Sequence, residues 1–264
     1  TGKVTGANAI EVSWREQEYG TEDSSAQLEG AGFVRDEGDR KPFSNLMEIF
    51  RKSAQISGTL NAITVEGIGN ELQNELSMRM AEMKQDIDRE LITGVKSKGS
   101  GVKGNTMAGI MNLIHTDNVV TRKALDFEAL QKVFQTMFDV GYGGNKLCII
   151  SSDLMGQLNT LAKNDATINL TMGETIYGLG VTRLVSSFGS ADILIDPYVP
   201  KGAMIFVDPT YIEVPHLRQF QARELSSTTD STEFGIVVEL SLKYLAGKSG
   251  AVLKIDAEAV EETP

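Results

Sequence analysis

Residues 67–94 read GIGNELQNELSMRMAEMKQDIDRELITG, and this stretch is the clearest structural signal in the chain. Its apolar residues recur at steps of four and three, the spacing of one face of an α-helix. No proline interrupts the run, and Gly94 is placed to end it. About 26 helical residues would extend close to 40 Å, more than twice the average helix. The pattern favours a helix lying across a sheet or a neighbouring subunit over a coiled coil, and its stripe comprises Ile68, Leu72, Leu76, Met80, Met83, Ile87 and Leu91.

The segment before this helix predicts a long hairpin with a polar tip. Residues 8–14 (NAIEVSW) alternate Ile10, Val12 and Trp14, which is typical of a strand. Residues 16–40 (EQEYGTEDSSAQLEGAGFVRDEGDR) hold eight carboxylates and two arginines, too polar to bury the apolar area that folding requires. Residues 43–65 are again compatible with strands. We therefore expect residues 14–59 to form one hairpin that reaches beyond its own compact body.

The part of the chain after the helix alternates helix and strand signals. Residues 95–109 are rich in Gly, Ser and Lys and predict a loop. Asp126 is a candidate N-cap for a helix whose apolar face holds Phe127, Leu130, Val133, Phe134 and Met137. A buried strand at KLCII and a second helix from about Ser152 to Ala162 follow. Strands are then expected near 181–187, 191–196, 203–207 and through the C-terminal segment, so the fold class is α+β.

The composition excludes several classes of protein. The net charge of −11 argues against a protein that grips nucleic-acid phosphates, and no apolar run approaches the length of a membrane span. The single cysteine, Cys148, lies in an apolar run and is expected to be a buried hydrophobe. The sequence opens at Thr1 without methionine, so we expect a processed or trimmed N-terminus.

Motif searches predict no catalytic residue, no cofactor and no metal site. GSGVKG at 99–104 matches a dinucleotide-binding pattern, but it follows a helix instead of a strand. AGKSG at 246–250 lacks the glycine of a phosphate loop, since position 242 is Leu242, and is expected to be a hairpin turn. His115 and His216 have no ligands at metal-site spacing.

The charge distribution suggests a contact between copies of the chain. Residues 16–40 carry a net −6 (eight acidic, two basic), and Lys96, Lys98 and Lys103 form the densest basic patch. We hypothesise that the acidic arm of one subunit lies over this patch on another, with two unrelated solvated surfaces as the alternative. The proposed contact residues are Glu16, Glu18, Glu22, Asp23, Glu29, Arg35, Asp36, Glu37, Asp39, Arg40, Lys96, Lys98 and Lys103.

The order of these elements resembles the major capsid proteins of tailed phages with the Hong Kong 97-like fold. The resemblance rests on IEVSW before the acidic extension, the long helix, TMAGIMNLI, FDVGYGGNKLCIISSDLMGQL, and the tail from FQAREL to AVLKI. The end of the long helix, DRELITG, is similar to the family's E-x-x-L-x-x-G end, with Asp88 in the place of the glutamate. Thr229 stands where the family tail usually has glycine.

The resemblance implies a spine helix with β-strands, an extended β-hairpin loop and an inserted α/β axial domain. It maps residues 1–14 to an N-terminal strand of the peripheral domain and 15–58 to the extended loop. Residues 59–124 would then be peripheral domain with the spine helix at 67–93, residues 125–207 the axial domain, and residues 208–264 the C-terminal peripheral strands.

The expected function is that of a structural subunit without enzymatic activity. Copies would form pentamers and hexamers of an icosahedral head that encloses double-stranded DNA without binding it specifically. Portal, scaffolding or cement proteins are possible partners, with no membrane involved. The shell would be assembled in the host bacterial cytoplasm and the protein located in the virion. The alternatives are an encapsulin-like nanocompartment shell, a carboxylate-dependent hydrolase on the α/β module, and a secreted adhesin.

Overall fold

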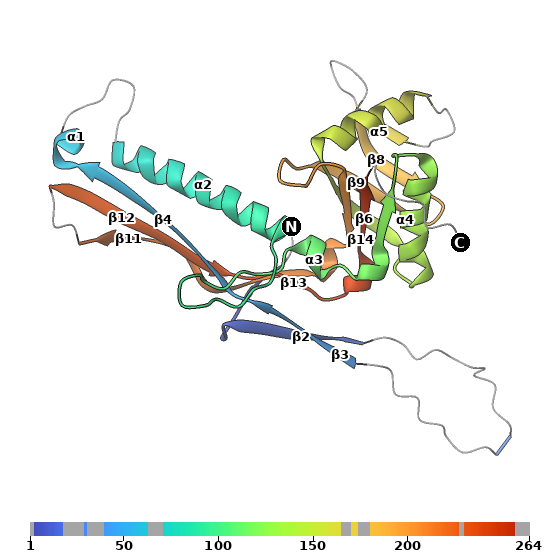
Figure 1. The fold of residues 1–264 in the computed structure, drawn as a ribbon, viewed down its shortest axis with the longest axis horizontal. Helices are drawn as coiled ribbons and strands as arrows, with labels where there is room; N and C mark the ends of the chain where they lie inside the picture. The colour runs from blue at the N-terminus through green and yellow to red at the C-terminus, as the bar shows by residue number, and fades with distance from the viewer. Residues whose placement is uncertain are drawn as a thin grey trace.

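The computed structural model describes residues 3–17, 29–30, 40–62, 71–164, 170–173, 180–226 and 230–256. In these ranges the chain forms two sheets, a separate two-stranded hairpin and one long helix (Figure 1). The helix is α2 (Glu71–Thr93), about 35 Å long at 1.5 Å per residue. Its expected first residues, 67–70, lie outside the described ranges.

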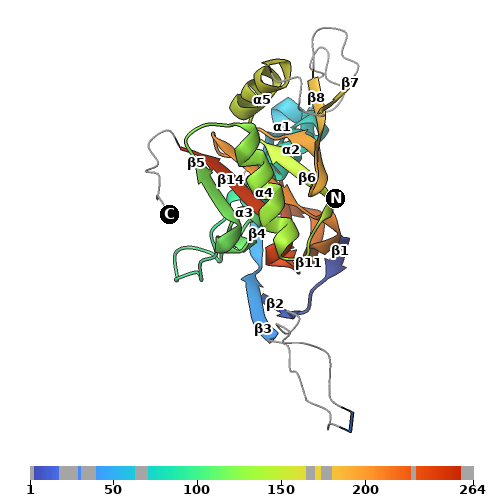
Figure 2. The same ribbon diagram turned by 90° about the vertical axis from the view of Figure 1, so that its right-hand side faces the viewer.

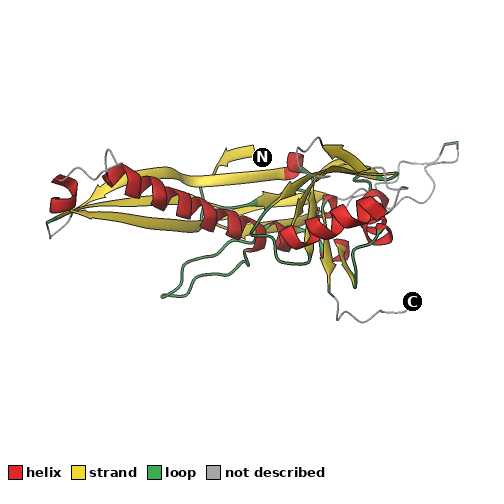
Figure 3. Cartoon of the chain, turned by 90° about the horizontal axis from the view of Figure 1, so that it is seen from above, coloured by secondary structure: helices red, strands yellow, loops and turns green. Residues whose placement is uncertain are grey.

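The first sheet has the strand order β1-β11-β12-β4, and β13 also pairs with β11. Among the described strand pairs of this sheet, β1–β11 is parallel and the others are antiparallel. The long helix lies along these strands (Figure 3). The bounds are β1 (Lys3–Gly6), β4 (Glu48–Ser57), β11 (Ile212–Leu225), β12 (Ser231–Leu240) and β13 (Lys243–Tyr244).

The predicted apolar stripe of the long helix faces this sheet. Met83 and Ile87 are buried with Phe50 of β4 and Ile236 of β12 in one core. Leu72, Leu76, Met80 and Leu91 are half-buried, while Ile68 lies outside the described residues. Successive strand residues point to opposite faces, so the odd-numbered residues of β4 lie on the face turned away from α2.

The second sheet has seven strands, in the order β5-β14-β10-β6-β9-β8-β7. Helices α4 (Phe127–Asp139) and α5 (Ser152–Asn164) pack on it through a second core that includes Val133, Phe134 and Leu158 (Figure 2). The strands are β5 (Val119–Arg122), β6 (Gly144–Ile150), β7 (Leu170–Gly173), β8 (Gly180–Ser186), β9 (Gly189–Ile195), β10 (Ala203–Val207) and β14 (Ala251–Ile255).

The helix expected after Asp126 is confirmed, including its cap, because the Asp126 carboxylate accepts a hydrogen bond from the Ala129 amide at 2.7 Å. Phe127 is an exception. It is 44% exposed instead of buried, because it occupies the first helical position, before the buried face begins.

Short helical segments connect the larger elements. They are α1 (Gly58–Ala62), α3 (Ile110–Leu113), η1 (Thr116–Asn118), η2 (Pro209–Tyr211) and η3 (Gly247–Ser249). Residues 246–250 were expected to turn between two strands of one hairpin. That expectation is wrong, because the segment leads from β13 in the first sheet to β14 in the second. The last strand therefore joins the α/β module, although residues 208–264 were expected to be peripheral.

The hairpin is shorter than expected. Its strands β2 (Glu11–Gln17) and β3 (Arg40–Leu46) pair from Glu11↔Leu46 to Gln17↔Arg40. Residues 48–57, the rest of the expected return arm, pair with β12 in the first sheet. The two strands β3 and β4 follow each other through Met47 along nearly one line (Figure 1). Both segments have a sequence pattern typical of strands, which is why the sequence predicts one continuous arm of a hairpin.

Candidate subunit interface

The base of the hairpin, here called the stem (residues 11–17 and 40–46), projects from the body of the molecule (Figure 2). Val12 and Trp14, which were expected on one side of a strand, are both buried, and the Trp14 ring stacks on Phe43 with centroids 6.2 Å apart. Ile10 was expected on the same side but is 60% exposed, because it lies at a bend before β2 begins. The stem thus has its own apolar contact.

Asn45 fastens the stem to the body. Its side chain is fully buried and makes four hydrogen bonds. The amide nitrogen donates to the carbonyls of Ala108 (3.0 Å) and Leu242 (2.8 Å), and the oxygen accepts from the amides of Leu46 (2.9 Å) and Ala108 (2.8 Å). All the hydrogen-bonding capacity of this buried amide is used, so the direction of the stem is set by specific bonds.

Two of the residues expected to contact another subunit are used inside the chain. The Glu16 carboxylate accepts a hydrogen bond from the Gly247 amide at 2.9 Å. The Lys96 ammonium donates to the Ser44 carbonyl at 2.7 Å and lies 3.4 Å from the Glu11 carboxylate. Hydrogen bonds from Ser44 and then Lys96 hold the pKa of Glu11 below its usual range. These contacts brace the stem and leave Glu16 and Lys96 engaged.

Most residues of the predicted acidic arm are outside the part of the chain that the structure describes. Glu18, Glu22, Asp23, Arg35, Asp36, Glu37 and Asp39 lie outside the described residues. Glu29 is exposed in a turn with Gly30, whose φ of +81° suits glycine. Arg40 is exposed at the end of the stem.

The predicted basic patch lies on a hairpin-like loop after the long helix. Bridges join Ser97 to Thr106 and Ser100 to Lys103. Lys98 and Lys103 are exposed, and Val102 at the tip of the loop is 98% exposed. With Lys96 bound to the stem, the patch presents two exposed lysines instead of three.

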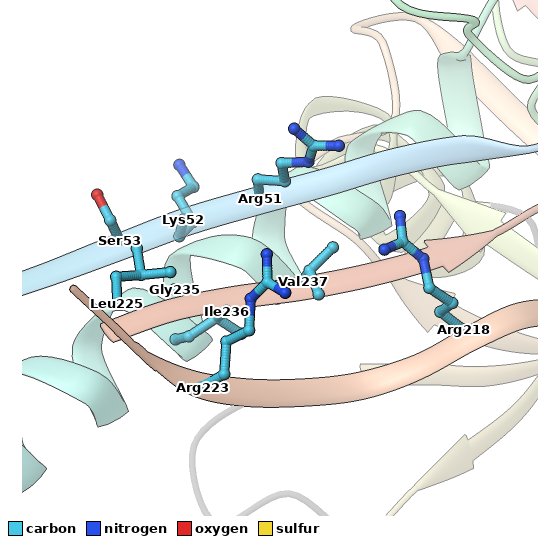
Figure 4. Close-up of a pocket in the computed structure, with 9 residues that line it drawn as sticks. All are labelled: Arg51, Lys52, Ser53, Arg218, Arg223, Leu225, Gly235, Ile236 and Val237. Carbon is cyan, nitrogen blue, oxygen red and sulfur yellow. The ribbon is translucent and has the colours of Figure 1, made fainter. Parts of the chain in front are cut away.

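A second basic surface was missed by the sequence analysis. Arg51, Arg218 and Arg223 line a groove of about 380 Å³ on the face of the first sheet turned away from α2 (Figure 4). They come from β4 and β11, on either side of β12. We call this surface the arginine groove; its other lining residues are Lys52, Ser53, Leu225, Gly235, Ile236 and Val237. Strand alternation could have predicted part of this surface, because it places Arg51 on the other face of the sheet from buried Phe50. The presence of β11 two strands away cannot be predicted from the sequence pattern.

Within the described ranges, no group of three or more His, Cys, Asp or Glu side chains could hold a metal ion. Nor is any helix in this part of the chain both long and apolar enough to cross a bilayer. Cys148 is fully buried, and burial raises the pKa of its thiol.

Two carboxylates meet where the long helix approaches the second sheet. Burial first, and then the charge and hydrogen bond of Asp196, raise the pKa of Asp88. Next to them, Arg89 lies over the Tyr198 ring at 5.3 Å. Asp88 also lines a groove of about 270 Å³, whose other lining residues are mainly apolar side chains of α2 and β11. This arrangement joins the long helix to the loop after β9.

Comparison with known proteins places this geometry in a family. A family model described as SU10 major capsid protein matches residues 1–256. No curated protein matches the chain.

Several solved structures are similar over almost the whole chain. The capsid of a native GTA particle aligns with a TM-score of 0.69 and 14% identity, covering 97% of this chain and 88% of that one. Microbacterium phage Oxtober96 gives 0.66 and 12%, covering 97% and 89%. The SrpI encapsulin of Synechococcus elongatus PCC 7942 gives 0.66 and 11%, covering 99% and 88%. These matches confirm the expected Hong Kong 97-like fold.

Proposed function

The chain belongs to the SU10 major capsid protein family, and on this premise we propose that its copies form pentamers and hexamers of the icosahedral head of a tailed phage or prophage. The protein is a capsid subunit located in the virion. Assembly in the host cytoplasm, enclosure of double-stranded DNA without specific binding, and the absence of catalysis are parts of this proposal.

The observation that carries the proposal is the anchored stem. Asn45, Glu16 and Lys96 fix its direction, and its open end at Gln17 and Arg40 lies away from both sheets (Figure 1). In the sequence, the most acidic segment of the chain connects these two residues. A segment this polar gains little from its own chain, so contact with neighbouring copies is what would offset the cost of ordering it. Many weak contacts repeated across a lattice would then hold the shell together.

The arm can be removed without disturbing the stem. Gln17 and Arg40 are directly paired, so a two-residue Asn-Gly turn can replace residues 18–39 and close the hairpin. We expect this variant to fold with unchanged far-UV circular dichroism but to form no closed particles by negative-stain electron microscopy. The unaltered chain should form uniform shells under the same conditions. If the shortened chain forms normal shells, the arm is not required for assembly and this part of the proposal is wrong.

An encapsulin-like shell is a second candidate, because the SrpI encapsulin shares the fold over nearly the full chain. The two differ in what the particle encloses. Particles isolated from the native source should contain nuclease-protected double-stranded DNA if they are phage heads, and a co-purifying enzyme if they are nanocompartments. Portal, scaffolding and cement proteins belong to the phage proposal and would co-purify with it.

The alternative of a carboxylate-dependent hydrolase would require a pair of carboxylates in a polar cleft. The Asp88–Asp196 pair instead lies beside a mainly apolar groove. An active, monomer-sized species would support the hydrolase, and particles without activity would support the shell.

A further inference from the structure

The arginine groove is a built feature of the first sheet. Gly235 lies between Ser53 of β4 and Arg223 of β11, and its missing side chain leaves the floor hollow. A Cβ at this position would come within 3.2 Å of Leu225. The register of β11 against β12 shifts twice between His216 and Gln221, which bends the strand beside the groove.

Two of the groove's cations have no partner in the described part of the chain. Arg218 is paired with Glu239 at 2.8 Å, and Lys52 turns to the other face to meet Asp86 at 2.7 Å. Arg51 and Arg223 make no ion pair within the described ranges and are both exposed. Glu233 is further along β12 on the same face and is half-buried. The groove therefore presents two free guanidinium groups around a hollow.

We propose that this groove receives the acidic arm, residues 18–39, of a second copy of the chain. The proposal rests on the proposed function, since it names the surface on which the arm of a shell subunit settles. The arm supplies carboxylates on a glycine-rich segment, and guanidinium groups bind carboxylates in planar, bidentate fashion. The hollow above Gly235 leaves room for a backbone to approach.

The arm of the same copy cannot fill the groove. Because β3 and β4 follow one line, the stem end at Arg40 is 11 to 13 residues from Arg51 and Ser53, or about 36–43 Å at 3.3 Å per residue. The stem directs the chain the opposite way. A hairpin of residues 18–39 reaches about 36 Å, so it would have to reverse fully and stretch to its limit. A neighbouring copy meets no such constraint.

The lysine loop is a weaker receptor than the groove. Lys96 is already bound to Ser44 and Glu11 of its own stem. Lys98 and Lys103 lie on an exposed loop, and lysine offers a point charge instead of a planar fork. This reasoning moves the receiving surface from Lys96, Lys98 and Lys103 to Arg51 and Arg223.

The proposal predicts that reversing the groove's charge impairs assembly. Arg51→Glu with Arg223→Glu should lower particle yield at low salt about tenfold or more, since a tenfold change corresponds to a loss of about 1.4 kcal/mol in all. Lys98→Glu with Lys103→Glu is the matched control, because it changes charge equally, and its yield should stay within about twofold. Adding Asp36→Lys and Glu37→Lys to the groove variant should restore yield. Equal effects of both variants, or no rescue, would overturn the proposal.

Disulfide trapping tests the contact directly. Arg223→Cys combined with Glu29→Cys or Glu37→Cys should give covalent dimers and ladders on non-reducing gels of assembled particles. Lys98→Cys combined with the same arm positions should stay largely monomeric. Cys148 is buried and does not compete. If every Arg223→Cys pair gives only monomers, the proposal is refuted. This test decides the proposal even if the charge-reversed variant fails to fold.

These outcomes are separable from failure of the proposed function. If the unaltered chain forms no particles, the capsid function fails with the inference. If particles form but neither charge reversal nor trapping involves the groove, only the inference fails. Loss of enclosed nucleic acid from the groove variant, at normal particle yield, would assign the groove to DNA phosphates and overturn the arm proposal.

Discussion

Replacing Asn45 with alanine tests whether the stem is locked to the body by hydrogen bonds. The substitution removes four buried bonds and leaves four backbone groups without this partner: the amides of Leu46 and Ala108 and the carbonyls of Ala108 and Leu242. At about 1 kcal/mol net per bond, we expect the free energy of unfolding to fall by about 4 kcal/mol. For a chain of this size that corresponds to a melting temperature lower by about 8–16 °C.

The single tryptophan makes the measurement local. Trp14 lies in the stem against Phe43, so its fluorescence reports on the stem while far-UV circular dichroism reports on the whole chain. In urea, Asn45→Ala should move the fluorescence transition to lower concentration than the dichroism transition. Asn112→Ala is the control, because Asn112 is exposed and donates only to the carbonyls of Thr93 and Gly94, and it should cost less than about 1.5 kcal/mol. A loss below about 1 kcal/mol in Asn45→Ala, with coincident transitions, would refute the reasoning.

Three further predictions concern buried groups. Burial raises the pKa of Glu48 to about 6, although the hydrogen bond from the Met107 amide acts in the opposite direction. The contribution of this carboxyl group to the free energy of unfolding is therefore complete below pH 4.5 and is lost as the pH rises through 6. Glu48→Gln should therefore stabilise the protein by about 1 kcal/mol at pH 7.5, after allowing for solvent screening, and not at pH 4.5; equal effects at both pH values in urea titrations would contradict this. Asp208→Ala leaves the buried Lys146 ammonium without its partner at 3.0 Å and should cost about 3 kcal/mol in urea unfolding. The double change Lys146→Met with Asp208→Asn should cost less, and a neutral single variant would argue against the ion pair. Cys148 should resist a thiol reagent at pH 8 in the native protein and react on unfolding, whereas rapid native labelling would show that this core opens.

Local signals in the sequence were sufficient for the helices and for single strands. The stripe from Leu72 to Leu91 predicted the long helix, and Asp126 marked the start of α4 because a cap acts over three residues. The run KLCII predicted β6, since apolar β-branched residues there are buried in the sheet.

Long-range pairing was the part that the sequence concealed. Residues 48–57 alternate as well as residues 40–46, and only the partner strand β12, some 180 residues later, separates them from the hairpin. Likewise, Ala251–Ile255 could pair with β12 or with β10, and nothing local distinguishes these sheets. Arg51 and Arg223 are far apart in sequence, so their positions around one groove follow from the strand register alone.

The mass of the purified full-length chain in solution, measured by multi-angle light scattering, tests the central claim most directly. If the stem presents its acidic segment to other copies, the chain should appear in particles many times heavier than one 28.6 kDa subunit. A single species at 28.6 kDa that persists at high concentration would contradict the account.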